Sequence, residues 1–137
     1  MTQRYMLDTN VVSHIMQGRD AELLARLTQV PVGQVVISSV TLAELEYGLH
    51  RKGLPPRLQN ALNQVLLRMD VLPWDEAVAR CYGAFCSTLE ARGINLSDLD
   101  MMIAAHAVAV DATLVSRDKG FAHVPEVLPA LLKLETW

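Results

Sequence analysis

Short apolar runs alternate with longer amphipathic segments along the whole chain. Five of the runs are brief and rich in β-branched or large apolar side chains, a pattern typical of strands. They are the segments 5–8 (YMLD), 34–38 (QVVIS), 70–74 (DVLPW, ended by Pro73), 112–116 (ATLVS) and 131–136 (LLKLET). We predict that these segments form one sheet.

The segments between the runs have apolar residues at helical spacing. The predicted helices are 9–18, ending at Gly18; 20–29, with Asp20 as N-cap; about 39–51, capped by Ser38, Ser39 or Thr41; 55–69; 75–92, closed by Gly93; and 97–110, opened by Ser97. Strands that alternate with helices indicate an α/β fold, in which helices cover both faces of a mainly parallel sheet. Sites in such sheets lie outside the carboxyl ends of the strands.

One predicted helix carries an apolar stripe with two possible uses. In residues 55–69 the stripe comprises Leu58, Leu62, Val65, Leu66 and Met69. It either covers the core of the domain or serves as an interface between two copies of the chain.

Composition restricts the class of protein. The 137 residues are enough for one compact domain, 1–137, with a real core, and 51% are apolar against 20% charged. No apolar run approaches the roughly 20 residues that cross a bilayer, and Asp8 interrupts any signal-peptide pattern, so we expect a cytoplasmic protein. Cys81 and Cys86 lack further ligands at zinc-site spacing and are predicted to be reduced core thiols.

The net charge of −3 excludes a broad basic surface for nucleic acid. Any such contact is therefore local or depends on bound cations. Alternatively, some of the acidic residues hold a metal ion, which reverses the sign of the local field.

Four acidic residues fall where a parallel sheet would bring them together. Asp8 ends one predicted strand and Asp118 follows another, whereas Glu44 and Asp100 lie on helices beside them. Each also has a local explanation: Asp8 as a helix N-cap, Glu44 in a capping box with Thr41, Asp100 at capping-box spacing from Ser97, and Asp118 in a turn. Glu46 competes with Glu44, and Asp98 with Asp100, so only the four acids together indicate a site.

Two other acidic α/β sites fit less well. A receiver-like signalling domain needs an aspartate at the end of its middle strand, where this chain has "VISS". A phosphatase of the D-x-D type needs an acid two residues after Asp8, where Asn10 stands.

Four motifs, in order, resemble the PIN-domain ribonucleases, and specifically the VapC-type toxins of toxin–antitoxin pairs. They are "MLDTN", "ISSVTLAELEYG", "SDLDMMIAAHA" and "LVSRDKGFAHV". The resemblance implies a PIN-like three-layer α/β/α fold with a central, mainly parallel sheet. It assigns the catalytic and metal-binding acids to Asp8, Glu44, Asp100 and Asp118, and the polar helpers to Thr9, Asn10 and Ser116. "LSD" replaces the usual Pro or Gly-Pro upstream of Asp100, so the start of that helix differs from the family pattern.

The resemblance also implies an activity. Such proteins cleave RNA, including transfer RNA, with Mg²⁺ or Mn²⁺, inhibit translation and growth, and are neutralised by a VapB-like antitoxin. They form homodimers and contact DNA only through the antitoxin. Asp8 and Asp100 would be the principal metal ligands, Glu44 a second ligand or the group that orients water, and Asp118 would act through water. The alternative is a catalytically silent co-repressor that acts with the antitoxin.

RNA needs positive charge besides the metal. The candidates are Arg51, Lys52, Arg57, Arg117 and Lys119, and the last pair is preferred because it flanks Asp118. His106 lies on an apolar helix and is predicted to be a core or interface residue. His14, two turns after Asp8, is left without a role.

Overall fold

The computed structural model describes residues 3–127 and 131–137. Within these residues five strands form one sheet in the order β3-β2-β1-β4-β5, and every pairing is parallel. The strands are β1 (Tyr5–Leu7), β2 (Val35–Ser38), β3 (Asp70–Leu72), β4 (Thr113–Val115) and β5 (Leu134–Glu135). The predicted α/β class with a parallel sheet is confirmed.

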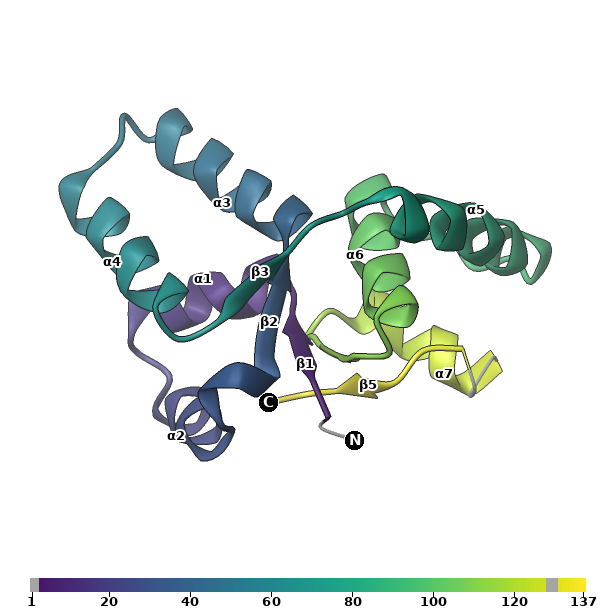
Figure 1. Ribbon diagram of the computed structural model, residues 1–137, viewed down its shortest axis with the longest axis horizontal. Helices are drawn as coiled ribbons and strands as arrows, with labels where there is room; N and C mark the ends of the chain where they lie inside the picture. The colour runs from purple at the N-terminus through teal and green to yellow at the C-terminus, as the bar shows by residue number, and fades with distance from the viewer. Residues whose placement is uncertain (1–2, 128–130) are drawn as a thin grey trace.

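Helices connect the strands and cover both faces of the sheet (Figure 1). They are α1 (Thr9–Gln17), α2 (Ala21–Gln29), α3 (Ser39–Arg51), α4 (Pro56–Leu66), α5 (Glu76–Ala91), α6 (Asp98–Ala109) and α7 (His123–Val127), with short 3-10 turns η1 (Val32–Gln34) and η2 (Lys119–Ala122). The prediction missed α7, η1 and η2, because elements this short carry little periodic signal. In the described parts of the chain, no helix is both apolar enough and long enough to cross a bilayer.

Successive residues of the central strands enter two different cores. Leu7, Ile37 and Val115 pack on one side of the sheet with α1, α2, α3 and α4. Met6, Val36 and Leu114 pack on the other side with α5 and α6. Because both of their faces are covered, the central strands β1, β2 and β4 are mostly apolar, as expected of a three-layer α/β/α fold.

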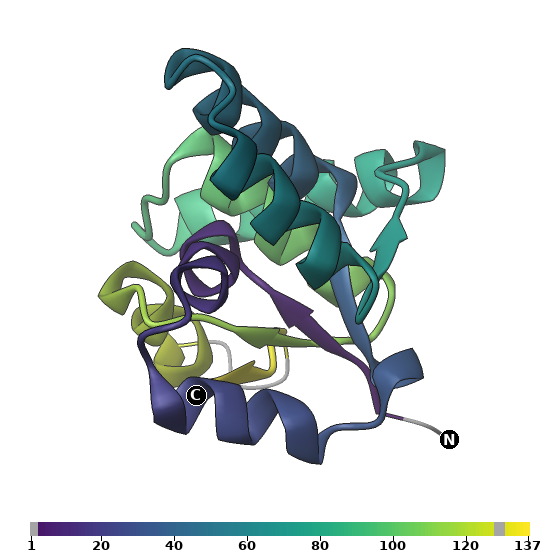
Figure 2. The ribbon, with the colours of Figure 1, turned by 90° about the vertical axis from the view of Figure 1, so that its left-hand side faces the viewer.

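The apolar stripe of α4 belongs to the first of these cores. Leu62, Val65 and Met69 are buried, and Leu58 and Leu66 pack against the same cluster. Figure 2 views the molecule from this side and shows α1 between α2 and the α3–α4 hairpin. Of the two uses considered for the stripe, the structure therefore shows core packing.

Local capping signals were accurate guides to the helix ends. Asp8, Asp20, Asp75 and Ser97 each accept a backbone hydrogen bond as N-caps of α1, α2, α5 and α6. Gly18 ends α1 with φ 69°, a left-handed conformation that glycine adopts without strain. The first strand ends at Leu7, one residue earlier than predicted, because Asp8 has already become the cap.

Candidate active site

The candidate site begins where three neighbouring strands end. Leu7 of β1 is in register with Val115 of β4, so Asp8 and Ser116, the residues that follow, also lie side by side. The backbone N–H of Asp8 continues the ladder by donating to the carbonyl of Val115 over 3.1 Å. Ser38 ends β2 on the other side of β1. Parallel pairing thus brings residues far apart in the sequence to one edge of the sheet.

The carboxylate of Asp8 is almost completely buried, with 4% of the residue exposed. Its Oδ1 accepts from the N–H of Val11 at 2.9 Å, and its Oδ2 accepts from the hydroxyl of Ser116. Burial raises the pKa of Asp8, these two hydrogen bonds lower it, and the charges of Asp100 and Asp118 raise it further. Asp8 is therefore both the cap of α1 and a member of an acidic cluster, so the two explanations of this residue hold together.

Asp100 and Asp118 are the two other acids of the cluster, and their negative charges act on Asp8. Asp100 is half-buried in the first turn of α6, where its N–H donates to Ser97 Oγ at 3.2 Å. Burial and the charge of Asp118 raise the pKa of Asp100, whereas a hydrogen bond between its carboxyl and the side chain of Ser97 lowers it. Asp118 is exposed, and its Oδ1 accepts from the N–H of Gly120 at 2.8 Å, so it also shapes a turn. The competing Asp98 is exposed.

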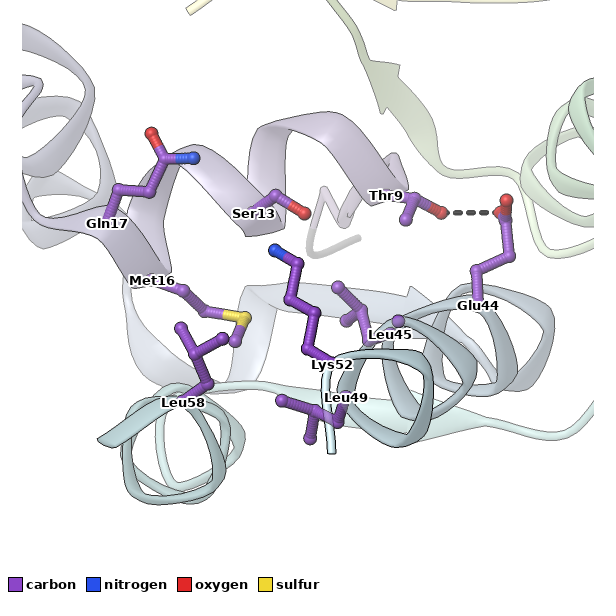
Figure 3. A pocket seen from close by; sticks show the side chains of 10 residues that line it. Thr9, Ser13, Met16, Gln17, Glu44, Leu45, Leu49, Lys52 and Leu58 are labelled. Carbon is purple, nitrogen blue, oxygen red and sulfur yellow. Dashed lines mark hydrogen bonds between the residues drawn. The ribbon is translucent and has the colours of Figure 1, made fainter. Parts of the chain in front are cut away.

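Glu44 joins the site through Thr9. The hydroxyl of Thr9 donates to Glu44 Oε1 at 2.6 Å (Figure 3). Thr41 Oγ1 lies 3.4 Å from Thr9 Oγ1. The alternative of a capping box between Thr41 and Glu44 is wrong, because Ser38 caps α3 and Glu44 bonds to Thr9 instead. Glu46 is exposed.

Of the three predicted polar helpers, Thr9 and Ser116 are hydrogen-bonded to acids of the site, whereas Asn10 makes no such bond among the described residues. Thr9 holds Glu44, and Ser116 holds Asp8 while its Oγ also accepts from the N–H of Asp118 at 3.0 Å. Ser116 thus connects two of the acids. Asn10 is exposed on the first turn of α1.

The oxygen-only set of donors suits a hard divalent cation. In the described parts of the chain, no three His, Cys, Asp or Glu side chains lie closely enough together to hold a metal by themselves. Mg²⁺ does not need such a cage, since it is usually bound by one or two carboxylates and keeps several waters. Asp8 and Asp100 fit this requirement: both carry a pKa raised by burial and by a neighbouring negative charge, which a cation would neutralise.

The predicted RNA-binding cations differ in availability. The guanidinium of Arg117 pairs with Asp20 at 2.7 Å, and its Nε donates to the carbonyl of Trp137. Arg51 lies over the ring of Tyr47. Lys119 is exposed beside Asp118. Lys119 is therefore better placed than Arg117 to contact a phosphate.

A cavity of about 140 Å³ opens beside Thr9 and Glu44, between α1, α3 and α4. Figure 3 shows Ser13 and Gln17 along α1, Lys52 extending from α3 toward α1, and an apolar wall. The apolar lining residues are Met16, Leu45, Leu49 and Leu58. Sequence reasoning missed this cavity. Its signal was the polar series Thr9, Ser13 and Gln17, which repeats every four residues on one face of α1.

We expect the Thr9→Val protein to lose about tenfold in the rate constant of any reaction that needs Glu44 in place, as is usual when a hydrogen bond that orients a ligand is removed. Valine keeps the shape of threonine but cannot donate to Glu44. Thr9→Ser should recover the rate. Thr28→Val, which removes a hydroxyl bonded only to the backbone of α2, is the matched control. Equal rates for Thr9→Val and Thr28→Val would contradict this role.

Comparison with known proteins identifies the family. The PIN domain family model matches residues 5–127. Ribonuclease VapC2 of Rickettsia felis is 31% identical over 140 residues, covering 97% of each chain. The tRNA(fMet)-specific endonuclease VapC of Shigella flexneri is 35% identical over 104 residues, covering 76% of this chain and 78% of that one.

A solved structure matches the fold over its full length. The crystal structure of VapBC2 from Rickettsia felis bound to a DNA fragment from their promoter superimposes with a TM-score of 0.88 at 29% identity, covering 98% of this chain and 99% of that one. The fold and the match to the family model define a PIN domain. The chain belongs to the PIN-domain family and, within it, to the VapC ribonucleases.

Proposed function

We propose that this protein is a Mg²⁺- or Mn²⁺-dependent endoribonuclease toxin, which stops growth by cleaving RNA needed for translation. The observation that supports this most directly is the environment of Asp8: a buried carboxylate whose pKa is raised by burial and by Asp100 and Asp118, while Ser116 and Val11 hold its two oxygens. A buried carboxylate without a positively charged partner is unfavourable. A cation bound by Asp8 and Asp100 would remove this penalty.

The residues around the site have separate proposed roles in the reaction. A divalent metal, when bound, would lower the pKa of a bound water so that it loses a proton and becomes a nucleophile for phosphorus, and would also neutralise negative charge on the leaving oxygen. Ser116 and the N–H of Val11 fix the orientation of Asp8, and Thr9 fixes Glu44. Glu44 would orient the attacking water or bind a second ion. The expected products carry a 5′-phosphate and a 3′-hydroxyl, because the bond to the 3′ oxygen breaks.

Mapping RNA ends in cells tests this proposal. Induced expression should create new 5′-phosphate ends at defined positions, and the Asp8→Asn protein, at equal abundance, should create none. The same ends in both cultures would show that another nuclease makes them.

We propose transfer RNA as the first substrate to test. Relatives such as the one from Shigella flexneri are named for tRNA(fMet). An anticodon or other loop presents unstacked bases that a small basic patch can reach. With a net charge of −3, the protein would rely on the metal and on local cations such as Lys119 and Lys52.

A VapB-like antitoxin is the proposed partner, since the solved relative is a VapBC complex. The cavity between α1, α3 and α4 has an apolar wall beside Glu44. An amphipathic antitoxin helix would place an apolar side chain among Met16, Leu49 and Leu58 and direct a cationic one toward the acids.

We expect Leu58→Asp to weaken antitoxin binding at least about tenfold, because a buried carboxylate without a partner would face the inserted apolar side chain. Isothermal titration against the antitoxin measures it. Leu67→Asp, at the residue that follows α4, which is 75% exposed and outside the lining of the cavity, should bind normally. If Leu67→Asp weakens binding as much as Leu58→Asp, the antitoxin does not use this cavity.

The complex would contact DNA through the antitoxin, a proposal that the promoter-bound relative supports. A catalytically silent co-repressor is therefore the second candidate. Growth arrest by the Asp8→Asn, Asp100→Asn double variant would favour it, and loss of arrest would favour the nuclease.

A homodimer remains a proposal taken from the family resemblance. Because the stripe of α4 lies in the core, it lends the dimer no support. Light scattering of the purified protein decides the oligomeric state.

A further inference from the structure

A histidine in the last turn of α6 is hydrogen-bonded to the start of α3. His106 and Ser38 are both 0% exposed, and His106 Nδ1 lies 2.8 Å from Ser38 Oγ. Ser38 ends β2 and is the N-cap of α3. This hydrogen bond therefore crosses from α6, which carries Asp100, to α3, which carries Glu44.

The hydrogen bonds around this pair involve only one of the two nitrogens of His106. Ser38 Oγ accepts from the N–H of Val40 at 3.1 Å, and its hydroxyl can either donate to Nδ1 or accept from it, according to the tautomer of His106. In both tautomers Nε2 has no hydrogen-bond partner among the described residues. Burial and the charge of Arg4 lower the pKa of His106, and the charge of Asp75 opposes them.

An unpartnered nitrogen in the core is unfavourable, and an apolar side chain of similar size would avoid it. Core packing alone therefore does not explain a histidine at this position. What histidine adds is the bond to Ser38. Because His106 is wholly buried, it cannot touch a substrate, and any effect it has on the reaction passes through the two helices that it joins, α3 and α6.

A second bridge joins the same two helices. The backbone N–H of Trp74 donates to Ser39 Oγ at 3.0 Å, and its indole Nε1 donates to the carbonyl of Met102 at 3.0 Å. Ser39 is the first residue of α3, and Met102 lies two residues after Asp100. The first turn of α3 is thus tied to α6 at two points.

These ties lie close to the acids along the helices. Glu44 is six residues after Ser38, and Asp100 is six residues before His106. At 1.5 Å per residue, each acid lies roughly 9 Å along its helix axis from the bond. A shift or tilt of the first turn of α3 would therefore displace Glu44 by a similar amount.

We propose that His106 is a positioning residue, whose hydrogen bond to Ser38 holds α3 against α6 and so sets Glu44 relative to Asp100. This inference rests on the proposed nuclease function. It assigns His106 no proton transfer. The bond orders the site, in the same way that residues behind the ligands of other catalytic sites fix their geometry.

Three variants separate positioning from stability. His106→Leu fills the space but cannot bond to Ser38. His106→Asn places a carboxamide close to the position of Nδ1 and restores a donor and an acceptor. Ile103→Ala, at a side chain of the same helix that is also buried, weakens the core but leaves the bond intact. All are compared at a temperature at which each is fully folded.

We expect His106→Leu to lower kcat for RNA cleavage about tenfold, with KM within about twofold, because misplacing a catalytic group by less than an ångström is costly. His106→Asn should recover most of kcat, and Ile103→Ala should keep it. Equal kcat for His106→Leu and Ile103→Ala would overturn the proposal, as would an asparagine variant no better than leucine.

Amide hydrogen exchange supplies a readout without RNA. The N–H groups of Val40 and Thr41, in the first turn of α3, should exchange faster in His106→Leu than in Ile103→Ala or His106→Asn. Equal exchange overturns the positioning role. If the wild type cleaves no RNA at all, the proposed function fails, and exchange alone still decides whether His106 holds α3.

Discussion

The Asp8→Asn protein is expected to cleave RNA at least about a thousandfold more slowly than the wild type. A factor of about a thousand corresponds to about 4 kcal/mol of transition-state stabilisation, a reasonable share for a principal metal ligand. Asparagine should keep the fold, because it is a good N-cap for α1 and its amide oxygen still accepts a hydrogen bond. Single-turnover cleavage of a labelled RNA measures the loss.

Asp75→Asn is the matched control. Asp75 caps α5 by accepting from the N–H of Val78, the same role that Asp8 has for α1, but it does not belong to the acidic cluster. We expect it to cleave at the wild-type rate. A slow Asp75→Asn protein would mean that helix capping, rather than the charge of Asp8, limits the reaction.

The same Asp8→Asn substitution should make the metal-free protein more stable at neutral pH. The pKa of Asp8 is raised in the folded state, so its ionised form disfavours folding above that pKa. The stability that this group contributes is fully present below its unfolded pKa of about 3.9 and is lost as the pH rises through the folded pKa. The substituted asparagine carries no charge at any pH. The advantage in free energy of unfolding over the wild type, measured with urea, should therefore shrink as the pH falls from about 7 toward about 4.

Millimolar Mn²⁺ or Mg²⁺ is expected to stabilise the wild-type protein markedly. A ligand present at about 100 times its Kd, and bound only by the folded state, adds about 2.7 kcal/mol to the free energy of unfolding. The effect should be large here because, without a cation, burial and the neighbouring negative charges raise the pKa values of both Asp8 and Asp100. Thermal melts with Mn²⁺ and with EDTA measure it.

Variants locate the bound ion. Asp8→Asn and Asp100→Asn should remove most of the increase in Tm, whereas Asp75→Asn should keep it. An equal increase in the wild type and all three variants would place the cation elsewhere. No increase at a Mn²⁺ concentration that supports full cleavage would contradict the carboxylate site.

Much of the fold follows from local patterns. Apolar runs with β-branched residues became strands, and the side-chain caps at Asp8, Asp20 and Ser97 began helices as expected. These signals act between residues at most a few positions apart, so they can be read along the chain. The identity of the four candidate acids also followed from the motifs.

The partners of those acids could not be read in this way. Thr9 bonds to Glu44 across 35 positions, and Ser116 bonds to Asp8 across 108. Arg117, a preferred candidate for RNA, is held by Asp20 and Trp137. Such contacts depend on which strands are neighbours, and the order β3-β2-β1-β4-β5 is not a local property of any segment.

The sequence by itself therefore determined the α/β class, most of the helix boundaries and the set of candidate acids, because periodicity and capping are short-range. Only the tertiary structure decided that α4 turns its stripe inward, that Ser116 links Asp8 to Asp118, and that His106 ties α6 to α3. Those outcomes depend on the order and register of parallel strands, which bring distant residues to the same edge of the sheet.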